Sequence, residues 1–210
     1  MHIYAFGSVC RGDIDRGSDV DLLAIVDGYD DRFDPSIYSI YSYQRIEQLW
    51  NEGNPFAWHL SLESRLLHSS DTMDFIRDLG APRKYENGPA DCIKFNQIFQ
   101  EARSSFLMSD ECKVFDLSSM FLGIRNFATC YSLAFMDSAD FSRNSANCLG
   151  KQSIPVNNKI YEIFENSRLL CTRAIGRPPS KSELTLAQHH FDIVANWMMD
   201  LLSRSGVKHV

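Results

Sequence analysis

The chain has 210 residues, of which 44% are hydrophobic and 23% charged, and a net charge of −6. This composition is ordinary for a globular protein, and the length allows one large domain or two smaller ones. No run approaches the 18 apolar residues of a spanning helix, and no basic segment precedes an apolar stretch at the N-terminus. These observations predict a cytoplasmic protein without a membrane partner.

The charge is unevenly distributed along the chain. Residues 1–88 carry 15 acidic and 8 basic side chains, whereas residues 89–210 carry 12 and 13. An acidic front half argues against a nucleic-acid partner, because such partners usually meet a basic patch. The acidic balance of residues 1–88 is compatible with a site that binds divalent cations. The six cysteines are widely spaced and form no C-x-x-C pair, which argues against structural zinc.

The first half of the chain mixes strand and helix patterns. Short apolar runs predict strands over 2–6 and 18–27. Helical spacing predicts a helix over 36–52, which Gly53 ends. Alternating apolar and polar residues then predict a strand over 55–64, and a Ser/Asp start with a Gly stop predicts a short helix over 69–80.

The second half is helical throughout. A segment rich in Pro and turn residues, 81–90, marks the boundary, and helical runs follow at about 91–108, 114–137, 156–175 and 183–204. We therefore expect an α/β (α+β) domain with a short mixed sheet over 1–85. A C-terminal α-helical bundle is expected over 86–210.

Two carboxylates lie at the start of the second predicted strand. Asp19 and Asp21 are two positions apart, so on a strand both side chains project to one face, roughly 7 Å apart. Carboxylates at this separation can hold one or two Mg²⁺ ions. A pair of such ions can stabilise the attacking and leaving oxygens of an in-line phosphoryl or nucleotidyl displacement.

A glycine-containing loop precedes these carboxylates. Gly7 lets the backbone approach a phosphate closely, Ser8 adds a hydroxyl, and the N–H groups of the following turn can cradle an anion. Arg11 can neutralise charge on a leaving pyrophosphate. The loop is therefore a candidate triphosphate site beside a candidate metal site.

The stretch "GSVCRGDIDRGSDVDLLAIV", residues 7–26, resembles the signature of the polymerase-β-like nucleotidyltransferase superfamily. It is especially similar to the minimal and aminoglycoside nucleotidyltransferase branches. The matching positions are Gly7, Ser8, Arg11, Gly12, Ser18, Asp19 and Asp21. The resemblance implies transfer of an NMP from an NTP such as ATP with Mg²⁺ or Mn²⁺, with Asp19 and Asp21 as metal ligands and Ser18 in the nucleotide site.

The family usually supplies a third carboxylate from a later strand, to complete the metal site or act as a base. In "PFAWHLSLES" that register falls near His59, with Glu63 further along the same face. Glu63 is thus the candidate third metal ligand and catalytic acid, and His59 a candidate ligand or base. In the bundle, Arg125 is either part of a buried hydrogen-bonding pair or a nucleotide contact, and Lys159 is a further candidate for phosphate binding.

Two functions follow from these patterns. The first is an active nucleotidyltransferase whose acceptor hydroxyl belongs to a small molecule such as an aminoglycoside, or to a protein. The alternative is a non-catalytic, nucleotide-binding or antitoxin-like member of the same superfamily, which acts through a partner. That partner is a second copy of the chain or a toxin-like protein.

Overall fold

The computed structural model describes residues 1–13 and 20–205. It divides into two compact units, Met1–Glu86 and Asn87–Val210, and each is described by itself. Across the described residues, no helix combines the length and the apolar character needed to cross a membrane.

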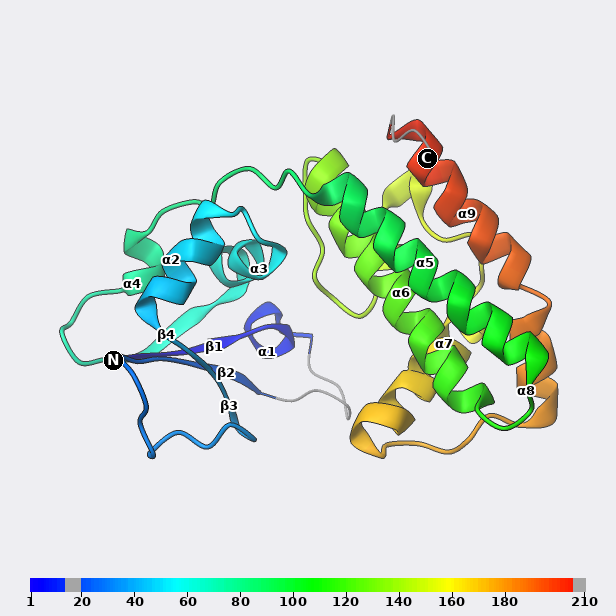
Figure 1. The fold of residues 1–210 in the computed structure, drawn as a ribbon, viewed down its shortest axis with the longest axis horizontal. Helices are drawn as coiled ribbons and strands as arrows, with labels where there is room; N and C mark the ends of the chain where they lie inside the picture. Colours follow the sequence, from blue (N-terminus) through cyan, green and yellow to red (C-terminus); the bar gives the residue numbers. More distant parts are fainter. Residues whose placement is uncertain (14–19, 206–210) are drawn as a thin grey trace. The chain divides into compact units, whose positions relative to one another are not determined.

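A four-stranded sheet forms the centre of the first unit (Figure 1). Its strands are β1 (His2–Phe6), β2 (Asp21–Ile25), β3 (Tyr38–Tyr41) and β4 (Arg65–Ser69), in the order β3-β2-β1-β4. Strand β1 pairs antiparallel with β2 and β4, whereas β2 and β3 run parallel. The sheet is therefore mixed, and the predicted fold class, an α/β (α+β) unit with a short mixed sheet followed by a helical region, is confirmed.

Helices cover one face of this sheet (Figure 1). They are α2 (Tyr43–Asn51), α3 (Pro55–Glu63) and the short α4 (Phe75–Asp78), while the single turn α1 (Ser8–Arg11) follows β1. The sheet contributes Tyr4, Phe6, Leu23 and Ile25 to the shared core, and the helices contribute Ile46, Leu49, Trp50, Ala57, Leu60 and Ile76. Burial of these apolar side chains supplies the main driving force for folding of the unit.

The predicted strand over 55–64 is wrong, because this segment is helix α3. Asn54 caps the helix, since its side chain accepts a hydrogen bond from the Phe56 N–H, and Pro55 occupies the first turn. Ala57 and Leu60, three residues apart, are fully buried. The apparent alternation therefore came from a helix that is apolar on more than one side, not from a strand.

Two other predicted helices are shorter than expected. The run over 36–52 splits into β3 and α2 at Ser42, whose hydroxyl accepts from the Arg45 N–H and so caps the helix. The helix expected over 69–80 is confined to α4, which Asp74 caps through the Arg77 N–H. In both cases a local cap places the start of the helix later than predicted.

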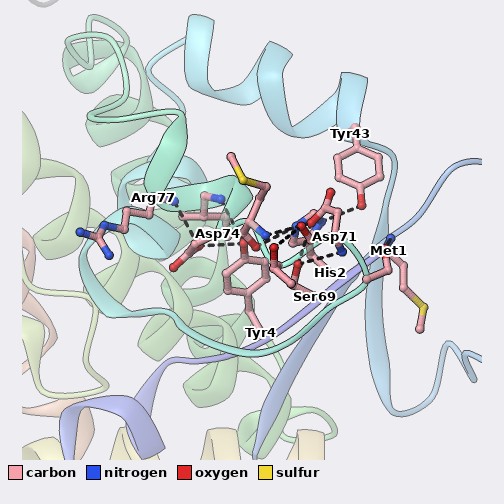
Figure 2. Close-up of polar contacts among 12 residues, drawn as sticks. Met1, His2, Tyr4, Tyr43, Ser69, Asp71, Asp74 and Arg77 are labelled. Atoms are coloured by element: carbon pink, nitrogen blue, oxygen red, sulfur yellow. Dashed lines mark hydrogen bonds and ion pairs between the residues drawn. The ribbon is translucent and has the colours of Figure 1, made fainter.

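A polar cluster ties the start of β1 to the chain after β4 (Figure 2). The buried His2 ring contacts the Tyr43 hydroxyl through Nδ1 at 2.7 Å and Asp71 through Nε2 at 3.2 Å. Tyr4 donates to Asp74 Oδ1 at 3.0 Å and accepts from the Ile76 N–H. Burial, above all, raises the pKa of Tyr4, so its hydroxyl stays protonated and keeps this contact.

The second unit is helical. Its helices are α5 (Gly88–Met108), α6 (Lys113–Phe135), α7 (Asn158–Arg173), α8 (Lys181–Gln188) and α9 (Phe191–Arg204), with short 3₁₀ turns at Ser145–Asn147 and Gly150–Gln152. Helix α6 packs against both α5 and α7, α9 packs on α5, and α8 packs on α7. The single helix predicted over 183–204 is two helices, because α8 ends at Gln188 and α9 begins at Phe191.

Gly53 allows the chain leaving α2 to pack against the segment at 83–84. Its φ is +61°, and an added Cβ would overlap the carbonyl oxygens of Arg83, at 2.6 Å, and Lys84. Trp50 and Trp58 donate indole hydrogen bonds to Gly80 and Arg83 carbonyls, which hold the same segment in place. The glycine is thus required by both backbone conformation and space.

We predict that Gly53→Ala lowers the free energy of unfolding of the protein by at least about 2 kcal/mol more than Gly80→Ala. Gly80 has a similar positive φ, +68°, but nothing lies within 4 Å of its added Cβ, so it isolates the cost of the backbone conformation. Urea denaturation of both variants measures the difference. Equal losses would show that the 83–84 segment moves away without cost.

Candidate active site

The candidate site lies where β1 ends and β2 begins. Phe6 pairs with Asp21 across the antiparallel ladder, and Gly7 follows immediately. Gly7 has φ +77° and ψ −144°, and a Cβ on it would lie 2.6 Å from Asp21 Oδ2. The Asp21 carboxylate therefore rests directly against the Gly7 backbone, in space that only a glycine leaves open.

The turn α1 starts at this point. The N–H groups of Cys10 and Arg11 donate to the Gly7 carbonyl at 3.1 and 3.2 Å, and Gly12 ends the turn in the left-handed conformation, φ +82°. This turn brings Ser8 and Arg11 next to the strand end that carries Asp21. The predicted phosphate-loop residues and one predicted metal ligand are thus neighbours in the structure.

Arg11 bridges two carboxylates. Its Nε donates to Asp13 Oδ2 at 2.9 Å, and its Nη1 donates to Glu63 Oε2. The Arg11 side chain is 21% exposed and that of Glu63 is 11% exposed. Burial works to lower the pKa of Arg11, but the bond to Asp13 and the charge of Glu63 outweigh it, so the pKa is raised. The guanidinium is therefore a permanent cation in this arrangement.

His59 and Glu63 lie on the same face of α3, one helical turn apart. His59 Nε2 is 2.9 Å from Glu63 Oε2, and the imidazole packs edge-on against Phe6, with ring centroids 5.6 Å apart. The prediction that these two residues share a face is confirmed, although it was based on a strand and the segment is a helix. Helical i, i+4 spacing brings them together instead.

Cys10, Arg65 and Asp13 also belong to this site, and the sequence reasoning did not single them out. Burial, above all, raises the pKa of the Cys10 thiol, while nearby Arg65 lowers it and Glu63 raises it. Arg65 is the first residue of β4 and pairs with Ala5, one strand position before Phe6. Cys10 and Asp13 flank Arg11 in the sequence and were open to local reasoning, whereas Arg65 enters the site only through strand pairing.

The Asp21 carboxylate is suited to bind a hard cation such as Mg²⁺, because carboxylate oxygens are its preferred ligands. Asp21 presents its carboxylate over Gly7. Asp19 and Ser18 lie outside the described residues, so their predicted roles stay predictions. Among the residues that the structure describes, no group of three His, Cys, Asp or Glu side chains is arranged to hold a metal ion.

Glu63 fits the role of third metal ligand poorly. Arg11 Nη1 and His59 Nε2 both contact the same oxygen, Glu63 Oε2. A divalent cation on this carboxylate would lie beside the guanidinium, and like charges at such separations repel strongly in a partly buried site. The arrangement therefore leaves Asp21 as the described carboxylate that best fits a metal.

Arg125 and Lys159 lie in the helical unit. The Arg125 guanidinium donates to the carbonyl oxygens of Phe141 at 2.5 Å and Ser142 at 3.3 Å, and Ser145 donates to the Arg125 carbonyl. These hydrogen bonds hold the segment that follows α6 against that helix. Lys159 lines a cavity of about 320 Å³ beside α7 and α8. Nucleotide binding by either residue stays a prediction.

Comparison with known families gives a match, which covers the first unit. Residues 2–83 match a family model described as "Nucleotidyltransferase domain". The chain therefore contains a nucleotidyltransferase domain, and the resemblance to the polymerase-β-like superfamily is confirmed. Searches of curated proteins and of solved structures returned no match.

We predict that Gly7→Ala destabilises the protein through the strained backbone conformation and, in addition, through Asp21. The added Cβ would overlap Asp21 Oδ2, so the loss of unfolding free energy should shrink by about 1 kcal/mol or more when Asp21 is also changed to Ala. Gly12→Ala is a control for a positive φ alone, since its φ is +82° with ψ 9°, and nothing lies within 4 Å of its added Cβ. Chemical denaturation of the single and double variants checks this, and strict additivity would contradict the contact.

Proposed function

We propose that the first unit transfers an NMP, AMP from ATP, to a hydroxyl group of an acceptor molecule, with Mg²⁺ or Mn²⁺ as the cofactor. The matched domain supports nucleotidyl transfer in general. The observation that carries the finer proposal is the Asp21 carboxylate lying against the Gly7 backbone, beside the turn that holds Ser8 and Arg11. In this arrangement the proposed metal ligand lies next to the proposed phosphate-binding loop, at the end of β1.

In this proposal each residue has a separate task. Asp21, with Asp19, holds the metal, which when bound neutralises charge on the reacting phosphate oxygens. Gly7 and Ser8 contact the triphosphate through backbone N–H and hydroxyl groups, Ser18 lies in the same nucleotide site, and Arg11 contacts the pyrophosphate group. The acidic balance of residues 1–88 favours a cationic small acceptor, such as an aminoglycoside, or a protein, over RNA.

We predict that Asp21→Asn reduces metal-dependent pyrophosphate release from ATP at least about 100-fold, because the amide keeps the side-chain shape but loses the charge that holds the metal. Asp19→Ala should have a similar effect. The control is Asp27→Asn, which changes an exposed carboxylate just beyond the other end of β2. Full activity in both the Asp21 and Asp19 variants, with circular dichroism unchanged, would rule the proposal out.

A non-catalytic, nucleotide-binding role is the second candidate. It is favoured by one observation: Glu63, the expected third acid, contacts Arg11 and His59 through a single oxygen. A protein with only two metal-binding carboxylates could bind a nucleotide and act through a second copy or a toxin-like partner. Calorimetry with Mg²⁺–ATP separates the candidates, because binding without any pyrophosphate release across a panel of drug and protein acceptors supports the second.

A further inference from the structure

The contacts of Arg11 leave part of its guanidinium available. An arginine side chain has five N–H donors in one plane. In the described residues, one donor on Nε binds Asp13 and one on Nη1 binds Glu63, and no other acceptor takes the remaining three. Two carboxylates therefore fix the plane of the guanidinium, while the rest of its edge stays open to a further anion.

The contact with Glu63 is well suited to fix this plane. Both side chains are largely buried, at 21% and 11% exposed, so each charge depends on the other for stabilisation. His59, from the preceding turn of α3, contacts the same Glu63 oxygen and packs against Phe6 of β1. The carboxylate thus lies on helix α3, and the neighbouring His59 packs against the strand that leads into Gly7.

We propose that Glu63 is a positioning residue that holds the Arg11 guanidinium for the pyrophosphate portion of the nucleotide, and that it is not the third metal ligand. The inference rests on the proposed function and goes beyond it, because it assigns Glu63 to anion binding instead of metal binding. A pre-oriented guanidinium binds a phosphate with two parallel hydrogen bonds and loses less side-chain entropy than a mobile one.

A double-mutant cycle on Arg11 and Glu63 tests the proposal. Calorimetry measures the binding of inorganic pyrophosphate and of Mg²⁺–ATP, and a turnover assay measures the Mg²⁺ concentration for half-maximal activity. We expect Glu63→Gln to weaken pyrophosphate binding about tenfold without changing the Mg²⁺ requirement, as expected for loss of one charge-assisted hydrogen bond. In an Arg11→Ala background the same substitution should have no further effect.

The opposite pattern would overturn the proposal. If Glu63 is a metal ligand, Glu63→Gln will raise the Mg²⁺ requirement by the same factor whether or not Arg11 is present. Unchanged pyrophosphate binding in Glu63→Gln would also overturn it. Glu52→Gln is the matched control, because Glu52 forms an exposed pair with Arg45 on α2 of the same unit, 3.5 Å apart, and should leave every measurement unchanged.

A second variant covers the case in which Glu63→Gln does not fold. Arg11→Lys keeps the charge, but a single ammonium cannot present the planar edge that Glu63 and Asp13 orient. We expect it to lose most of the pyrophosphate affinity at an unchanged Mg²⁺ requirement, and wild-type affinity would overturn the proposal. Absence of Mg²⁺–ATP binding by the wild-type protein would overturn the proposed function as well, whereas an additive cycle in a protein that binds ATP overturns the positioning role alone.

Discussion

The close approach of the Asp21 carboxylate to the Gly7 backbone is the contact on which the rest of the site depends. Antiparallel pairing of Phe6 with Asp21 fixes where that carboxylate stands, and the missing side chain of Gly7 makes room for it. The turn α1 begins at Gly7, so the same contact also sets the position of Arg11. The proposed metal ligand and the proposed phosphate-binding cation are thereby positioned by the same end of β1.

Glu63 and His59 illustrate why a wrong secondary structure still gave the right neighbours. Positions four apart share a face on a strand, where the period is two, and on a helix, where it is 3.6. The prediction that they lie together therefore survives the replacement of a strand by α3. The Asn54-Pro55 start signal would have identified the helix, because it combines a side-chain cap with a proline in the first turn.

Residues that are close in the sequence could be predicted to lie together, whereas contacts between distant residues could not. The loop residues Gly7, Ser8 and Arg11 and the candidate metal ligand Asp21 lie within 15 residues, so the candidate site could be predicted from local spacing. The contact between Arg11 and Glu63 joins residues 52 positions apart, and Arg65 enters through strand pairing. No local pattern encodes such contacts. The same holds for Arg125, whose guanidinium donates hydrogen bonds to carbonyl oxygens of the chain that follows α6.

A crystal structure with Mg²⁺ and an ATP analogue whose α–β bridge is a methylene group tests the central claim most directly. The account predicts a metal ion bound to Asp21 and a triphosphate lying over Gly7 and Ser8, with its β- and γ-phosphates within hydrogen-bond distance of Arg11. A nucleotide bound elsewhere on the protein, or a metal ion bound to Glu63 with Arg11 displaced from it, would contradict the account.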